Sequence, residues 1–192
     1  MTKSILLVGV GGQGTITAAK LLTTGLLEAG CDVKMSEIHG MSQRGGTVSS
    51  HVRYNDDGKV NSPVIEERGA DILVSFEEME ALRWADYVKP EGAIVTSTEH
   101  LASTPIMSGR VSYPEHILDE LHKVAKTVLS IDAPAEAAKI GNTKVTNVIL
   151  LGTIVKYMGL EYIDWDKIIR ENVKPAFVEL NLKALELGKS LI

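Results

Sequence analysis

The side chains best suited to chemistry lie in one short segment near the N-terminus, residues 37–46, called the polar segment below. It places a carboxylate, an imidazole, a thioether, a hydroxyl, an amide and a guanidinium between glycines. Such a mixture of polar side chains is not typical of a hydrophobic core, so the segment indicates a surface that meets a ligand or a partner protein. Its candidate residues are Glu37, His39, Met41, Ser42, Gln43, Arg44, Gly45 and Gly46.

Three of these side chains suggest particular roles, and two of them also have an alternative interpretation. His39 could carry a proton or donate a hydrogen bond to a substrate, but a lone histidine next to a glycine also fits a structural turn. The Arg44 guanidinium could clamp a carboxylate or a phosphate, or form a salt bridge at a subunit interface. Met41 indicates an adaptable apolar contact with a partner or ligand.

A second candidate site is the glycine loop, residues 9–14, which has the spacing GxGxxG. It follows an apolar run and opens a helical pattern, the context that this motif requires. The helix start offers free N–H groups and a dipole that favour a phosphate. The alternative is that the glycines only allow close packing of strand and helix. The candidate binding residues are Gly9, Gly11, Gly12, Gln13 and Gly14.

A nicotinamide dinucleotide would need an acidic residue for its ribose at the end of the second strand. Glu37 lies 23 residues after Gly14, close to the usual spacing of about 20. However, residues 39–44 lack the pattern of the helix that a dinucleotide fold would begin there. The sequence therefore favours another phosphate-bearing ligand.

The elements that position both segments begin with a strand–helix–strand pattern, a βαβ unit. Residues 4–8 are a continuous apolar run, which predicts a strand buried on both faces. Residues 15–29 have helical apolar spacing that ends at Gly30, and residues 31–38 predict a second strand.

An inserted β-hairpin is predicted next. Residues 47–54 alternate in polarity, residues 55–58 carry a strong turn signal, and residues 59–64 resume an extended pattern. The remaining chain is predicted to contain strands at 71–76, 93–96 and 127–131, and helices at 77–88, from 113, at 132–141 and from 143 onward. The fold class is therefore α/β: a Rossmann-like, mostly parallel sheet with an inserted β-hairpin and a helical C-terminal region, in a single domain over residues 1–192.

The composition excludes several classes of protein. A net charge of −5 gives no electrostatic case for nucleic acid or anionic membranes. The single cysteine, Cys31, rules out a disulfide framework and a metal site built from this chain's own thiolates. No signal peptide is recognisable, and the longest apolar stretch, residues 145–155, is interrupted and too short to span a bilayer. We expect a cytoplasmic protein with no nucleic-acid or membrane partner.

Residues 8–14, 37–46 and 48–53 together resemble the gamma-type component of the 2-oxoacid:ferredoxin oxidoreductases. The motif HGMSQRGG at residues 39–46 is especially similar to that of the small beta subunit of the indolepyruvate type. The similarity extends over essentially the whole chain, including Gly141-Asn142-Thr143 before an apolar helix. The glycine loop is weakly specific, whereas HGMSQRGG is strongly specific.

The resemblance implies a subunit that is inactive alone, with no catalytic residue and no cofactor of its own. Thiamine diphosphate, magnesium and iron–sulfur clusters would lie in a large catalytic partner subunit. The complex would oxidatively decarboxylate an aryl 2-oxoacid, with coenzyme A accepting the acyl group and ferredoxin the electrons. The sequence agrees, because it has neither cluster cysteines nor an evident diphosphate–magnesium motif.

Two alternatives remain open at this stage. The chain could be a free-standing NAD- or FAD-binding Rossmann-type oxidoreductase, or a scaffold whose glycine loop binds nothing. The oxoacid is also open, because phenylpyruvate, branched-chain or 2-oxoglutarate specificity fits the same motifs.

Overall fold

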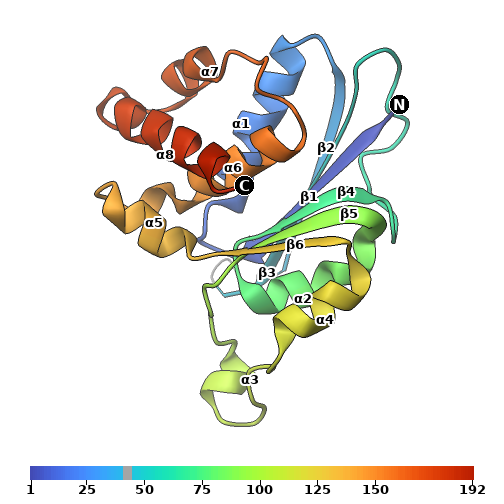
Figure 1. Ribbon diagram of the computed structural model, residues 1–192, viewed down its shortest axis with the longest axis vertical. Coiled ribbons are helices and arrows are strands. Elements are labelled where there is room, and N and C mark those ends of the chain that lie inside the picture. The colour runs from blue at the N-terminus through green and yellow to red at the C-terminus, as the bar shows by residue number, and fades with distance from the viewer. Residues whose placement is uncertain (41–44) are drawn as a thin grey trace.

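The computed structural model describes residues 1–40 and 45–192, and Figure 1 shows helices on both faces of a central sheet. The sheet has six strands in the order β2-β3-β1-β4-β5-β6. The strands are β1 (Lys3–Val10), β2 (Asp32–His39), β3 (Thr47–Asn55), β4 (Ala70–Ser75), β5 (Val88–Ser97) and β6 (Thr127–Ile131).

The strands β1, β4, β5 and β6 pair in parallel, as their apolar runs predict. In β1, Ile5, Leu6, Leu7 and Val8 are all fully buried, because helices cover both faces of this part of the sheet. The predicted buried strand at residues 4–8 is therefore confirmed.

The antiparallel hairpin is present, but its two arms are β2 and β3. Strand β3 is antiparallel to β1 on one side, with Val10 opposite Thr47, and to β2 on the other, with His39 opposite Val48. Residues 59–64 form no strand, so this part of the prediction was wrong. Both edges of β3 are already paired, which leaves no hydrogen-bonding edge for a further arm.

Helices form a layer on each face of the sheet (Figure 1). One layer contains the helical C-terminal region, as predicted, together with α1 and α5. The other contains α2 and α4, and the short α3 follows β5 at the end of the molecule. The helices are α1 (Thr15–Glu28), α2 (Glu78–Trp84), α3 (Thr104–Met107), α4 (Ile117–Val124), α5 (Ala133–Lys139), α6 (Thr146–Tyr157), α7 (Trp165–Asn172) and α8 (Val178–Ser190).

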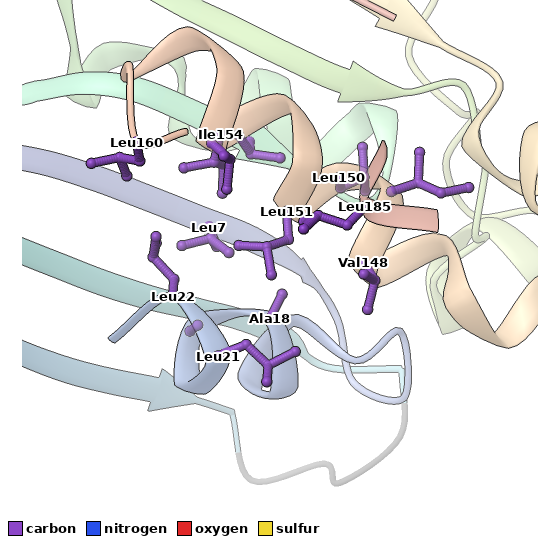
Figure 2. Packing of buried hydrophobic residues seen from close by; sticks show 14 of the residues in the cluster. Leu7, Ala18, Leu21, Leu22, Val148, Leu150, Leu151, Ile154, Leu160 and Leu185 are labelled. Atoms are coloured by element: carbon purple, nitrogen blue, oxygen red, sulfur yellow. The ribbon is translucent and has the colours of Figure 1, made fainter. Parts of the chain in front are cut away.

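The larger core lies between the sheet, α1 and the C-terminal helices (Figure 2). Helix α6 is buried from Asn147 to Val155, because α1 and the sheet cover one side of it and α8 covers another. Leu151 points toward Leu7 of β1, and Leu21 and Leu22 of α1 close the same cluster (Figure 2). A helix that is apolar all round is stable in water only when it is enclosed in this way.

Helices α6 and α8 touch backbone to backbone. A Cβ atom added at Gly188 would lie 1.9 Å from the carbonyl oxygen of Ile149, and one added at Gly152 would lie 2.4 Å from that of Leu185. Side chains cannot fit between these helices at the two glycines, so the pair packs as one unit beneath the sheet.

No helix in residues 1–40 and 45–192 combines the length and the apolar character that crossing a bilayer requires.

Candidate functional site

The glycine loop joins β1 to α1 where β1 and β4 end, and its backbone suits an anion. Gly14 caps α1 in the left-handed conformation with φ of 84°, and no side chain caps the helix. The first turn of α1 also has no acidic residue. Among the residues that the structure describes, the N–H groups at the start of α1 therefore lack a competing side-chain acceptor, and an anion is favoured there.

The glycines of the loop differ in what surrounds them. A Cβ atom at Gly9 would lie 2.9 Å from Cβ of Phe76, and one at Gly14 would lie 2.9 Å from Nδ2 of Asn147. These two glycines allow close packing, which is the plainer of the two sequence interpretations. Gly12 has φ of 107°, and no atom of residues 1–40 or 45–192 lies within 4 Å of a Cβ atom added there. It therefore faces open space, where a ligand could approach the backbone.

Gln13 turns its side chain into the protein. Its Oε1 accepts the backbone N–H of Val10 at 2.7 Å, and its Nε2 donates to the carbonyl of Phe76 at 2.7 Å and to Oε2 of Glu99 at 3.0 Å. An amide has one oxygen and two N–H donors, and all three of these groups are engaged. Only the backbone of Gln13 is therefore available to contact a ligand.

Two cavities adjoin the glycine loop. The larger cavity has a volume of about 640 Å³, and its walls include Gly12, Glu99, Lys144 and Asn147. The smaller cavity has a volume of about 480 Å³, and its walls include Gly12, Thr15 and His39. Among the described residues that line the smaller cavity there is no carboxylate, so it is the better environment for a phosphate.

The structure brings His39 and Gly46 of the polar segment to the glycine loop. The N–H of Gly11 donates to the carbonyl of Gly46 at 2.9 Å, which joins the two segments directly. His39 ends β2, is exposed and faces the smaller cavity. Met41, Ser42, Gln43 and Arg44 lie outside the described residues, so their predicted contacts stay predictions.

Glu37 does not occupy the place that a dinucleotide site requires. Strand β3 lies between β1 and β2, so Glu37 is two strands from the glycine loop instead of one. Each intervening strand adds about 4.8 Å in the plane of the sheet. Oε1 of Glu37 is buried without a hydrogen-bond partner among the described residues. The geometry thus weakens the case for an adenosine ribose at this residue.

The end of the polar segment is tied to α2 through a buried carboxylate. Thr47 donates its hydroxyl to Oε1 of Glu80 at 3.2 Å, and Nε of Arg83 donates to the same oxygen at 3.1 Å. Burial raises the pKa of Glu80, and Arg83 and Thr47 partly oppose that shift. The contact fixes where β3 begins and hence where the polar segment ends.

His51 lies further along the same face of β3, enclosed by Trp84 and Tyr87. Its Nδ1 accepts the backbone N–H of Ile65 at 3.2 Å, which requires a neutral imidazole with the proton on Nε2. Burial lowers the pKa of His51, and because Nε2 has no partner among the described residues, nothing stabilises the charged form.

This arrangement predicts a loss of stability in mild acid. Below a pH of about 6.5 the unfolded chain protonates His51 while the folded chain resists protonation, so the free energy of unfolding falls as pH falls. Between about pH 7.5 and about pH 5.5, the free energy of unfolding should fall less in the variant His51→Gln than in the wild type. The difference between the two proteins should be at most about 1.4 kcal/mol per pH unit. Urea unfolding at the two pH values measures the difference. The exposed His122→Gln is the matched control, and equal losses in all three proteins would refute the prediction.

The larger cavity contains residues that the sequence did not single out as a site. Glu99 follows β5 and Lys144 precedes α6, and only the tertiary fold brings them to the glycine loop. Asn142 accepts the N–H of Lys144 at 2.9 Å and orders this corner. The run Gly141-Asn142-Thr143 before an apolar helix was the available signal.

A metal or cluster site does not fit the described part of the chain. Residues 1–40 and 45–192 contain no group of three or more histidine, cysteine or acidic side chains that could hold a metal ion. Cys31 donates its thiol to Oδ1 of Asp56 at 3.2 Å. Burial raises the pKa of Cys31 to about 11, so the thiolate that a cluster needs is disfavoured.

A family model described as pyruvate ferredoxin/flavodoxin oxidoreductase matches residues 4–191. The chain belongs to this family.

Similar proteins are subunits of oxidoreductases. The chain is 38% identical over 194 residues to the indolepyruvate oxidoreductase subunit IorB of Archaeoglobus fulgidus, which covers 98% of this chain and 94% of that protein. It is 26% identical over 179 residues to the common gamma subunit of the pyruvate/ketoisovalerate oxidoreductases of Thermococcus kodakarensis, covering 93% and 90%. The chain is therefore a small subunit of a 2-oxoacid:ferredoxin oxidoreductase, and a free-standing NAD- or FAD-binding enzyme is not favoured.

Solved structures confirm the predicted fold class. Pyruvate oxidoreductase subunit PORC of Thermotoga maritima has a TM-score of 0.74 at 19% identity, covering 99% of this chain and 96% of that one. A 2-oxoglutarate:ferredoxin oxidoreductase of Magnetococcus marinus, with 2-oxoglutarate, coenzyme A and succinyl-CoA bound, has a TM-score of 0.74 at 18% identity. The match covers 99% of this chain but 31% of that longer one.

Proposed function

We propose that this chain is the small subunit of an indolepyruvate:ferredoxin oxidoreductase that converts an aryl 2-oxoacid to an acyl-CoA. The observation that carries the proposal is the identity of 31–38% to indolepyruvate oxidoreductase subunits from four organisms. The pyruvate and 2-oxoglutarate subunits are 25–27% identical. Thiamine diphosphate, magnesium and iron–sulfur clusters belong to the large partner subunit in this proposal, and ferredoxin takes the electrons from the complex.

Within that complex, the glycine loop receives a phosphate of coenzyme A. Support comes from the uncapped start of α1, the open space at Gly12 and the smaller cavity beside Thr15 and His39. The larger cavity has the carboxylate of Glu99 beside Lys144, whereas the smaller cavity has no carboxylate among its described residues, so we place the phosphate on the side of His39.

The polar segment, in turn, meets the catalytic partner. His39 and Gly45 are exposed, and Ile38 is 51% exposed although it is a large apolar residue. Such a side chain at the end of an edge strand is compatible with burial against another protein. The residues between them, including Arg44, complete this surface in the proposal.

The subunit assignment predicts that activity appears only with the partner. The purified chain should be colourless and should not oxidise indolepyruvate. Co-expression with a large iron–sulfur subunit should yield a brown complex with coenzyme A-dependent activity, because the cofactors supply the chemistry and this chain supplies none of their ligands. Absorbance at about 400 nm from the pure chain, or turnover by it, would refute the assignment.

The same complex tests the oxoacid. Rates with indolepyruvate, phenylpyruvate, pyruvate and 2-oxoglutarate should rank the two aryl substrates first by kcat/KM. A higher kcat/KM for pyruvate or 2-oxoglutarate would leave the subunit role intact and overturn the choice of substrate.

A further inference from the structure

The side chain of Gln13 joins the ends of three neighbouring strands. It accepts the N–H of Val10 at the end of β1 and donates to the carbonyl of Phe76, directly after β4. Its second donor reaches Oε2 of Glu99, two residues after β5, at 3.0 Å. These contacts fix the amide orientation, because the oxygen faces a donor and the nitrogen faces two acceptors.

Glu99 is held in place independently of Gln13. Its carbonyl accepts the N–H of Glu78 at 3.1 Å, and its own N–H donates to the Ser97 hydroxyl at 3.3 Å. Glu99 is thus anchored to the start of α2 and to the end of β5. The hydrogen bond from Gln13 to its carboxylate transmits this position to the glycine loop, and bonds to a charged acceptor are the stronger kind.

We propose that Gln13 and Glu99 form a positioning pair that holds the glycine loop in its ligand-receiving shape. Gly12 imposes little conformational preference of its own, so contacts from outside the loop must define its shape. The identity of the ligand as coenzyme A rests on the function proposed above. Neither side chain needs to touch the ligand, and both act through the backbone of the loop.

Exchanging the amide of Gln13 and the carboxylate of Glu99 tests the pair, because the double variant keeps the net charge of the wild type. In Gln13→Glu, a carboxylate faces the carbonyl of Phe76 and the carboxylate of Glu99, so two hydrogen bonds become repulsive contacts. In Glu99→Gln, the new amide can still accept from Gln13. In the double variant Q13E/E99Q, the amide at position 99 donates to the carboxylate at position 13, which restores one contact.

The first measurement is hydrogen–deuterium exchange of the peptide that contains residues 9–14, in the assembled complex. Exchange should rise most in Q13E, least in E99Q, and fall back in Q13E/E99Q relative to Q13E. The KM for coenzyme A should follow the same order, with a rise of about tenfold or more in Q13E and a much smaller change in the oxoacid KM. A structural defect alone would not be relieved by a second substitution that weakens the wild type.

The outcomes distinguish a failure of the positioning pair from a failure of the coenzyme A assignment. If E99Q fails to improve Q13E in loop exchange, the positioning pair is refuted. If Q13E does not assemble but Q13E/E99Q does, the rescue supports the pair. If loop exchange rises and falls back as expected while the KM for coenzyme A stays constant, the pair stands and the coenzyme A assignment of the loop fails.

Discussion

Replacing Gly188 by alanine is expected to cost the chain about 3 kcal/mol of stability, and valine should prevent folding of the C-terminal layer. The added Cβ atom would lie 1.9 Å from the carbonyl oxygen and 2.8 Å from the carbonyl carbon of Ile149. Both are backbone atoms in a buried helix, so neither can rotate away. The two helices would have to separate and open a gap beneath the sheet. The total stability of a domain is only about 5–15 kcal/mol, so such a loss is severe.

Urea unfolding followed by circular dichroism measures the effect. Lys183→Val is the matched control, because it places the same β-branched residue on an exposed position of α8. The control carries the helix-propensity cost of valine without the clash. A Gly188→Ala protein within about 0.5 kcal/mol of the wild type would show that α6 and α8 do not pack backbone to backbone.

Replacing Gly12 by valine in the assembled complex is expected to raise the KM for coenzyme A by about tenfold or more, equivalent to at least about 1.4 kcal/mol of binding free energy. The valine side chain would occupy the open space from which a phosphate would approach the start of α1. The KM for the oxoacid should change much less, because the proposal gives the loop no contact with that substrate.

The control must carry the same backbone strain. Gly30 also has positive φ, 85°, and nothing within 4 Å of an added Cβ atom, but it lies after the far end of α1. Gly30→Val should therefore lower stability comparably, by about 1–2 kcal/mol, and leave the KM for coenzyme A unchanged. If Gly12→Val assembles with a normal KM for coenzyme A, the glycines serve only packing of strand and helix.

The local sequence pattern was sufficient to predict most of the helices and strands of this fold. The apolar run at residues 4–8 predicted the buried strand β1, and Gly30 marked the end of α1 because a left-handed residue was needed there. In both cases the determining interactions lie within one segment or depend on burial alone, which hydrophobic periodicity reports.

The pairing partner of β3 could not be read from its own residues. Alternating polarity at residues 47–54 is compatible with any antiparallel neighbour, and the turn at 55–58 favoured the wrong one. The true neighbours β1 and β2 precede β3 in the chain, so their choice depends on long-range packing. The walls of the larger cavity escaped prediction for the same reason, since Glu99 and Lys144 are ordinary surface residue types.

The contacts of the glycine loop also determine when, during synthesis of the chain, the loop can take its final shape. Gln13 reaches residues 63 and 86 positions later in the chain, and Gly14 packs against Asn147, 133 positions later. A nascent chain that has left the ribosome only as far as β3 contains every glycine of the loop and none of these supports. Competence to hold a ligand must therefore arrive late in synthesis, after α6 has emerged and docked. The glycine loop therefore becomes a site only when Phe76, Glu99 and Asn147 have packed against it.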